Sequence, residues 1–326
     1  FNDAGGTNAG RAYIYYGGII VNSSVDVILT GLAAGDQFGI SVSSAGDVNG
    51  DGFGDVIIGA NNNDAGGSNA GRAYIYFGGS SMNNVADVLL TGAAISDNFG
   101  YSVSSAGDMN GDGYSDVIVG AQLNDAGGNA AGRAYVYHGG SSMNSVADLT
   151  ITGAAANDNF GNAVSLAGDM NGDGYGDIIV GANGNDAGGS SAGRAYVYFG
   201  GSIPDSIVDV TMTGAAASDN FGIYLSSAGD VNGDGFSDVI VSAYFNDAGG
   251  SNAGSAYIYF GGIIPNNTAD VIFIGAVAGD QLGISVSSAG DVNGDGYSDV
   301  IAGANLNDAG GASAGRAYVY FGGSAM

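Results

Sequence analysis

Short hydrophobic runs separated by turn residues follow one another along the whole chain. In the stretch that begins at Phe99, these runs cover residues 101–106, 116–121, 133–138 and 148–152. Residues 117–119 are continuously apolar, which is typical of a strand buried on both faces. Runs of this length, bounded by Gly, Asn and Asp, predict β-strands. No segment shows the apolar spacing of an amphipathic helix of useful length.

The four runs recur with a period of 61 residues. The repeated units are expected near 38–92, 99–153, 160–214, 221–275 and 282–326. Four strands per unit predict an all-β fold, a β-propeller of about five four-stranded blades in a single domain, 1–326. A parallel β-helix is the rival repeat fold, but its coils are usually shorter.

The order of the runs bears on how a ring would close. The chain ends on a third strand, so residues 26–31 would complete the last unit and leave residues 1–21 as a surplus third-strand segment. Closure of this kind would remove the open sheet edges that promote aggregation. The surplus segment could also pair with a neighbouring molecule. Because the chain starts at Phe1 without an initiator Met, we expect a mature product or an excerpt of a longer protein.

Five acidic loops of nine residues, such as DVNGDGFGD at 47–55, carry the clearest chemistry. Each loop crowds three carboxylates and one amide around two glycines, and such crowding favours a bound cation. The ligands would be the side chains at loop positions 1, 3, 5 and 9 and the carbonyl at position 7. These residues are Asp47, Asn49, Asp51, Phe53 and Asp55; Asp108, Asn110, Asp112, Tyr114 and Asp116; Asp169, Asn171, Asp173, Tyr175 and Asp177; Asp230, Asn232, Asp234, Phe236 and Asp238; and Asp291, Asn293, Asp295, Tyr297 and Asp299.

An all-oxygen ligand set favours Ca²⁺, whereas Zn²⁺ prefers His or Cys and Mg²⁺ demands stricter geometry. The prediction is about five calcium ions, one per repeat. A metal-free, Asp-rich turn would be a serious rival for one loop, but five intact copies favour metal. The loop starts like an EF-hand, but the chain has no Glu to supply that motif's last ligand.

The charge of the chain excludes several partners. All 32 acidic residues are Asp, the only basic residues are five Arg, and the net charge is -27. Nucleic acids and anionic membranes require clustered positive charge, so neither is expected as a partner. No apolar run is long enough for a membrane helix, which argues against membrane insertion. With no Cys, metal is a likelier staple than disulfides.

Catalytic groups are scarce. His138 is the only histidine, and it occupies a position where other units carry Phe or Tyr. Without Cys, Lys or Glu, the usual nucleophile and base arrangements cannot be assembled. Asp64 and Asp36, with their counterparts, would line the face opposite the metal loops. We favour a role for each in fixing its own turn over a role in an acidic binding ring. The repeated Arg is expected to pair with an Asp or a loop carbonyl.

Two further elements flank each acidic loop. An FG element occurs at Phe38-Gly39, Phe99-Gly100, Phe160-Gly161 and Phe221-Gly222, and a GA element at Gly59-Ala60, Gly120-Ala121, Gly181-Ala182 and Gly303-Ala304. With the acidic loop, they give the chain a resemblance to the FG-GAP repeats of integrin α-subunit propellers and their prokaryotic relatives. The resemblance implies a four-stranded blade per repeat, with one calcium ion between its first two strands.

The chain departs from the family pattern in several places. The Pro of GAP is replaced by Asn61, Gln122, Asn183, Tyr244 and Asn305. Leu282 replaces the Phe of the last FG element, and Ser242 replaces the Gly of the fourth GA element. Propellers of this family commonly have seven blades, so five units leave ring closure open.

These features together predict a non-enzymatic, calcium-binding adhesion or structural scaffold protein, secreted or at the cell surface. Its partners would be a protein or glycan ligand or further copies of itself, and it could serve as a building block of a surface polymer. The alternatives are a carbohydrate-binding module and an accessory propeller domain of a secreted hydrolase.

Overall fold

The structure is a computed structural model that describes residues 2–18 and 23–326. Both ends of the predicted surplus segment, residues 1 and 19–21, lie outside this description. The described residues form 21 strands and no helix, which confirms the all-β prediction. The strands make up four sheets of four strands, one sheet of three and one of two.

Each sheet is built from strands that are consecutive in the chain. The two-stranded sheet holds β1 (Arg11–Ile14) and β2 (Val27–Thr30). The first complete sheet holds β3 (Ser41–Gly46), β4 (Asp55–Ala60), β5 (Arg72–Tyr76) and β6 (Val88–Thr91). The second holds β7 (Ser102–Gly107), β8 (Asp116–Ala121), β9 (Arg133–Tyr137) and β10 (Leu149–Thr152).

The remaining sheets repeat this order. The third complete sheet holds β11 (Val164–Gly168), β12 (Asp177–Ala182), β13 (Arg194–Tyr198) and β14 (Val210–Thr213). The fourth holds β15 (Leu225–Gly229), β16 (Asp238–Ala243), β17 (Ser255–Tyr259) and β18 (Val271–Ile274). The three-stranded sheet holds β19 (Leu282–Gly290), β20 (Asp299–Ala304) and β21 (Arg316–Tyr320).

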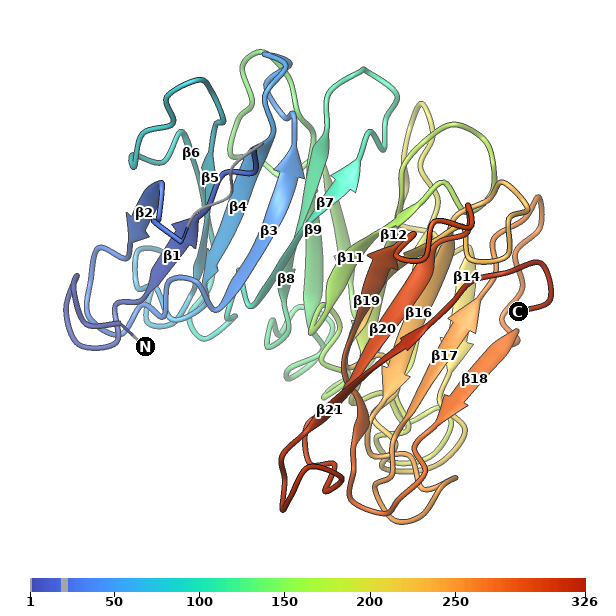
Figure 1. Cartoon of the computed structure of the whole chain (residues 1–326). Coiled ribbons are helices and arrows are strands. Elements are labelled where there is room, and N and C mark those ends of the chain that lie inside the picture. Colours follow the sequence, from blue (N-terminus) through green and yellow to red (C-terminus); the bar gives the residue numbers. More distant parts are fainter. Residues whose placement is uncertain (1, 19–22) are drawn as a thin grey trace.

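The sheets stand side by side around a common axis as the blades of a propeller (Figure 1). Neighbouring strands within a sheet are antiparallel. The first strands of successive sheets, β3, β7, β11, β15 and β19, contact one another along the axis. The second strands are the most buried, as β8 and β12 show along their whole length. The fold is therefore a β-propeller of four-stranded blades.

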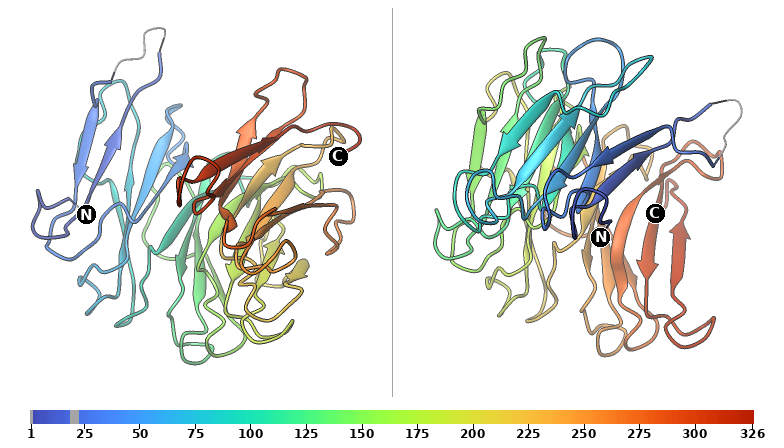
Figure 2. Two further views of the ribbon diagram at one scale, coloured as in Figure 1. Left: turned by 60° about the horizontal axis from the view of Figure 1, so that its bottom comes forward. Right: turned by 90° about the vertical axis from the view of Figure 1, so that its left-hand side faces the viewer.

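The expected closure of the ring by residues 26–31 does not occur in this structure. Strand β2 pairs with β1, and none of the residues that the structure describes adds a fourth strand to the last sheet beyond β21. The sheets consequently trace an open arc, with the two-stranded and three-stranded sheets at its ends (Figure 2). The physical reason is that β1 and β2 form the same local hairpin as every other third and fourth strand, and a local pairing has the smaller loop-closure cost.

The phenylalanine of the FG element packs between adjacent blades. Phe99 is 2% exposed and lies in one cluster with Leu90 of the preceding sheet and Val119 of its own. Its ring meets Tyr135 and Tyr137 edge-on, with centroids 5.4 and 6.4 Å apart. The residue therefore couples one blade to the next.

The glycine of the GA element permits a close approach of two backbones. A Cβ at Gly120 would lie 2.0 Å from the carbonyl oxygen of Gly161 in the next blade. The FG glycine lies at the equivalent junction with the preceding blade, since Gly100 adopts φ 81° and a Cβ there would lie 2.4 Å from the carbonyl oxygen of Arg72. Both glycines thus allow the backbones of adjacent blades to approach closely.

Candidate metal loops and the opposite face

Each acidic loop connects the first and second strands of its sheet, as the resemblance implied. Loop 47–55 leaves β3 at a bulge where Gly46 faces Asp55, and Gly50 and Gly52 adopt φ values of 74° and 87°. The carboxylate of Asp47 accepts hydrogen bonds from the N–H groups of Gly50, Asp51 and Gly52 at 2.7, 3.1 and 2.9 Å. The glycines permit this tight turn.

The middle of the loop places further oxygen atoms on its exposed side. The Asn49 amide donates to Asp51 at 2.9 Å, and the Asn49 oxygen accepts the N–H of Asp51 at 2.9 Å. The second carboxylate oxygen of Asp51 accepts the N–H of Phe53 at 2.9 Å. The loops that begin at Asp169, Asp230 and Asp291 repeat the whole network.

The aspartate at loop position 9 differs from the others because it is buried. Asp116 is 0% exposed, and its two carboxylate oxygens accept the N–H groups of Met109 and Gly139, both at 2.8 Å. The same two bonds occur at Asp55, Asp177, Asp238 and Asp299. This residue therefore joins the loop to the end of the third strand, a structural role that the loop sequence alone did not reveal.

Burial makes ionisation of this aspartate unfavourable in the first four loops. The pKa of Asp177 rises from 3.8 to about 7, chiefly through desolvation and further through the nearby carboxylates of Asp173 and Asp169. The pKa of Asp238 also rises to about 7 and that of Asp116 to about 6, and burial is the main cause at both sites. A cation in the loop would oppose the like-charge repulsion and favour the ionised form.

The donor chemistry of the loops fits a hard divalent cation. Among the residues that the structure describes, no group of three acidic or histidine side chains is drawn together in metal-binding geometry. The carboxylates instead hold the N–H groups of their own loop, and this network keeps the side chains at positions 1, 3 and 5 on one short turn. Carboxylate, amide and carbonyl oxygens are the ligands that calcium takes.

The aromatic residue at loop position 7 also links neighbouring loops, which sequence reasoning missed. A Cβ at Gly50 would lie 2.5 Å from the ring of Tyr114, so the ring of the next unit covers this glycine. The rings of Tyr175, Phe236 and Tyr297 cover Gly111, Gly172 and Gly233 in the same way. Backbone hydrogen bonds from Ser115 to Asp47 at 3.0 Å and from Gly140 to Val48 at 2.7 Å strengthen the link. The signal was present, because position 7 is aromatic in all five loops.

The aspartates of the opposite face fix local structure, as favoured from the sequence. Asp36 is buried, and its carboxylate accepts the amide of Asn63 at 2.7 Å. Burial raises the pKa of Asp36, and the bond from Asn63 partly offsets this effect. Asp64 accepts the N–H of Asn69 at 2.8 Å within its own turn. Because the Asp36-type residues are buried, they do not form an exposed acidic ring.

The repeated arginine has a different partner from the one expected. The Nε of Arg72 donates to the hydroxyl of Thr91 at 3.1 Å, and Arg11, Arg133 and Arg194 make the same bond to the threonine across the sheet. The fourth unit lacks both the arginine and the threonine, since Ser255 pairs with Ile274 at these positions. The hydroxyl of Ser255 donates to Asn246 at 2.9 Å instead.

Blades of antiparallel strands, each with an acidic loop between its first two strands, define a class of β-propeller in which every repeat carries one candidate cation-binding loop. An FG-GAP repeat model matches residues 38–76, 99–137, 224–259 and 282–320, and a second FG-GAP repeat model matches residues 143–198. These matches span more than half of the chain, so it belongs to the FG-GAP repeat family.

The curated relatives include several integrin α chains. The chain is 33% identical to integrin alpha-PS2 of Drosophila melanogaster over 62% of its own length, and 32% identical to integrin alpha-5 of Xenopus laevis over 47%. It is 29% identical to integrin alpha-8 of Gallus gallus over 74%. The chain covers only 15%, 15% and 24% of these relatives. In the described part of the chain, no helix has the length and apolarity needed to cross a membrane.

Proposed function

We propose that this chain is a calcium-stabilised, non-enzymatic propeller of an adhesion or scaffold protein, secreted or exposed at the cell surface. It binds a protein or glycan ligand there. The observation that carries the proposal is the fivefold loop with its buried aspartate. In each copy, oxygen donors share one turn with a buried carboxylate, and at Asp177 and Asp238 the neighbouring carboxylates repel its charge.

Calcium would be held by the loop residues at positions 1, 3, 5, 7 and 9. When bound, it supplies positive charge that neutralises the carboxylates, and five ions would bring the formal charge from -27 to -17. Extracellular calcium modules have Kd values of about 10⁻⁴–10⁻³ M, which suits a site filled outside cells. Metal binding and folding are then coupled.

The test is thermal and urea unfolding of the purified chain with calcium, with magnesium and with EDTA. At free calcium about tenfold above Kd, each site adds about 1.4 kcal/mol, so five sites add about 7 kcal/mol. Magnesium is expected to stabilise less, because it demands stricter octahedral geometry. Equal stability in calcium and EDTA would refute the proposal.

A matched pair of variants distinguishes the loss of a calcium ligand from the loss of one negative charge elsewhere. Asp112→Asn removes a carboxylate at loop position 5, and we expect it to lower the calcium-dependent stabilisation by about one site's share. Asp205→Asn removes the same charge at a position where Asn83, Asn144 and Asn266 stand in other units. It keeps the side-chain oxygen that accepts the N–H of Ile207. We expect this control to leave calcium dependence unchanged.

A second candidate function, a building block of a surface polymer, is favoured by the two incomplete sheets at the ends of the arc. Strand β1 has a partner on one side only, whereas the third strands β5, β9, β13 and β17 have partners on both sides. Strand β21 likewise lacks the outer partner that these four strands have. An open edge is a template for pairing with another chain. Another copy, or further residues of a longer chain, would complete these sheets.

Sedimentation and electron microscopy over a range of concentrations test this second candidate. Growing particles or filaments would support self-association. Discrete particles of one chain at all concentrations, with and without calcium, would refute it.

A further inference from the structure

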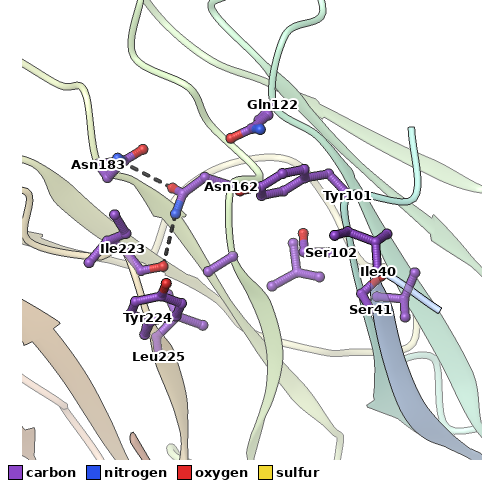
Figure 3. Close-up of a pocket in the computed structure, with 13 residues that line it drawn as sticks. Ile40, Ser41, Tyr101, Ser102, Gln122, Asn162, Asn183, Ile223, Tyr224 and Leu225 are labelled. Carbon is purple, nitrogen blue, oxygen red and sulfur yellow. Dashed lines mark hydrogen bonds between the residues drawn. The ribbon is translucent and has the colours of Figure 1, made fainter. Parts of the chain in front are cut away.

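A cavity of about 370 Å³ opens on the propeller axis, at the end of the inner strands away from the metal loops. Residues at or just before the starts of β3, β7, β11 and β15 line it, together with Gln122 and Asn183, which follow β8 and β12 (Figure 3). Its volume lies in the range of pockets that bind small molecules, roughly 300–1,000 Å³. Four blades therefore shape one site.

The repeat loses its regularity at this cavity. The residue after the FG element is Ile40, Ile223 and Ile284 in three units, but Tyr101 and Asn162 in the other two. The following position holds Ser or Ala in four units and Tyr224 in the fourth repeat. Positions that are free to diverge around one cavity are where a repeat protein can build a single asymmetric site.

Asn162 organises the wall of the cavity. Its amide donates to the carbonyl oxygen of Gly222 at 3.3 Å. The same amide donates to the carbonyl oxygen of Ile223 at 3.1 Å, and its oxygen accepts the N–H of Asn183 at 3.2 Å (Figure 3). One buried side chain thereby fixes the segment before Tyr224 and the segment that carries Asn183. The site is pre-organised rather than dependent on a mobile loop.

Two tyrosines offer aromatic surface to the cavity. Tyr101 and Tyr224 come from different blades and are 37% and 40% exposed. The ring of Tyr224 lies 6.0 Å from that of Tyr244, which in turn lies 4.1 Å from the ring of Phe245. Burial raises the pKa of Tyr224, and proximity to Tyr101 raises it further, so the hydroxyl stays protonated near neutral pH.

Hydrogen-bonding groups are also available. Within the described residues, the buried side-chain oxygen of Asn183 has no hydrogen-bond partner. A buried acceptor without a partner is costly, and a rotation of the Asn183 amide toward the cavity would let a ligand hydroxyl satisfy it. Gln122 adds a primary amide, with two donors and an acceptor, to the same lining.

The lining excludes several classes of ligand. It contains no Arg, so with a net charge of -27 an anion is disfavoured. It contains no Asp to pair with a metal ion or an ammonium group. A purely apolar guest would leave the amides without partners. The remaining class is a neutral ligand with many hydroxyl groups and an apolar face.

We propose that this cavity binds a neutral saccharide, with Tyr101 and Tyr224 against the C–H faces of the sugar and Gln122 and Asn183 bonded to its hydroxyls. The proposal is separate from calcium binding. Loss of sugar binding would leave the calcium-dependent stability intact, and the two proposals fail independently.

The test uses variants that borrow residues from other repeats. Tyr101→Ile introduces the residue of Ile40 and Ile223, and Tyr224→Ser introduces that of Ser41 and Ser102, so both variants should fold. The probes are the methyl glycosides of glucose, galactose and mannose, together with N-acetylglucosamine. Binding is measured by saturation-transfer NMR and calorimetry, and an unchanged calcium-dependent melting curve checks folding.

We expect at least one of these sugars to bind, and each variant to weaken that binding at least tenfold. Tyr15→Ser, which removes an exposed tyrosine outside this cavity, should leave binding unchanged. The proposal is overturned if none of the four sugars binds, or if binding survives both cavity variants. It is equally overturned if methylguanidinium, a probe for cationic side chains, occupies the cavity and the sugars do not.

Discussion

Replacement of Phe99 by alanine should weaken the packing between two adjacent blades and lower the free energy of unfolding. The ring is 2% exposed and fills the space between Leu90 of one sheet and Val119 of the next. Removal of a buried phenylalanine costs about 3–5 kcal/mol. Its edge-on contacts with Tyr135 and Tyr137 account for about 0.5–1.5 kcal/mol each. We expect Phe99→Leu to cost under about 1.5 kcal/mol, because Leu282 fills the equivalent position in the last unit.

The assay is urea unfolding at saturating calcium, followed by tyrosine fluorescence, since the chain has 19 Tyr and no Trp. Phe321→Ala is the control: this ring is 58% exposed, and its removal should change the free energy of unfolding by no more than about 0.5 kcal/mol. If Phe99→Ala costs no more than Phe99→Leu, the FG phenylalanine is not a wedge between blades and this reasoning fails.

Two further predictions concern the buried aspartates and the GA glycine. In EDTA, the free energy of unfolding should fall as pH rises from about 4 to about 7. The reason is that Asp177 and Asp238 keep their protons up to about pH 7 in the folded chain, whereas they release them near pH 3.8 in the unfolded chain. Urea unfolding at a series of pH values checks this, and stability that rises through the window in EDTA would contradict it. Gly120→Ala should lower the melting temperature, since the new methyl group meets the Gly161 carbonyl at 2.0 Å. Ser242→Gly, which restores the residue of the other units, should be tolerated; equal melting temperatures for Gly120→Ala and the unaltered chain would contradict the packing argument.

The sequence predicted the blade itself well. The short apolar segments that recur every 61 residues located the strands. Alternating and continuous apolar patterns indicate which positions are buried, as at Val117 and Ile118. The same pattern could not tell which partner β2 would choose. A local hairpin with β1 and a distant pairing with β21 use the same residues, and only the geometry of the whole arc distinguishes them.

The candidate site was predicted in part. The acidic loops could be recognised because the oxygen ligands of each one lie within nine consecutive residues. Asp116 is buried and accepts a hydrogen bond from Gly139, a residue beyond the loop, so the spacing within the loop could not reveal its structural role. The cavity was missed altogether, because Tyr101, Asn162 and Tyr224 lie about one repeat apart and meet only where inner strands surround the axis.

The aromatic rings that cover neighbouring loops give the molecule a direction. A ring from the following unit covers each of four loops, while no atom of the described residues lies near the site of a Cβ at Gly294 in the last loop. Each of these four junctions is therefore built from the same two surfaces, one with a glycine and the other with an aromatic side chain. A recombination event that removed or duplicated one whole unit would rejoin these surfaces unchanged, so a lineage could alter the number of blades without inventing a new contact.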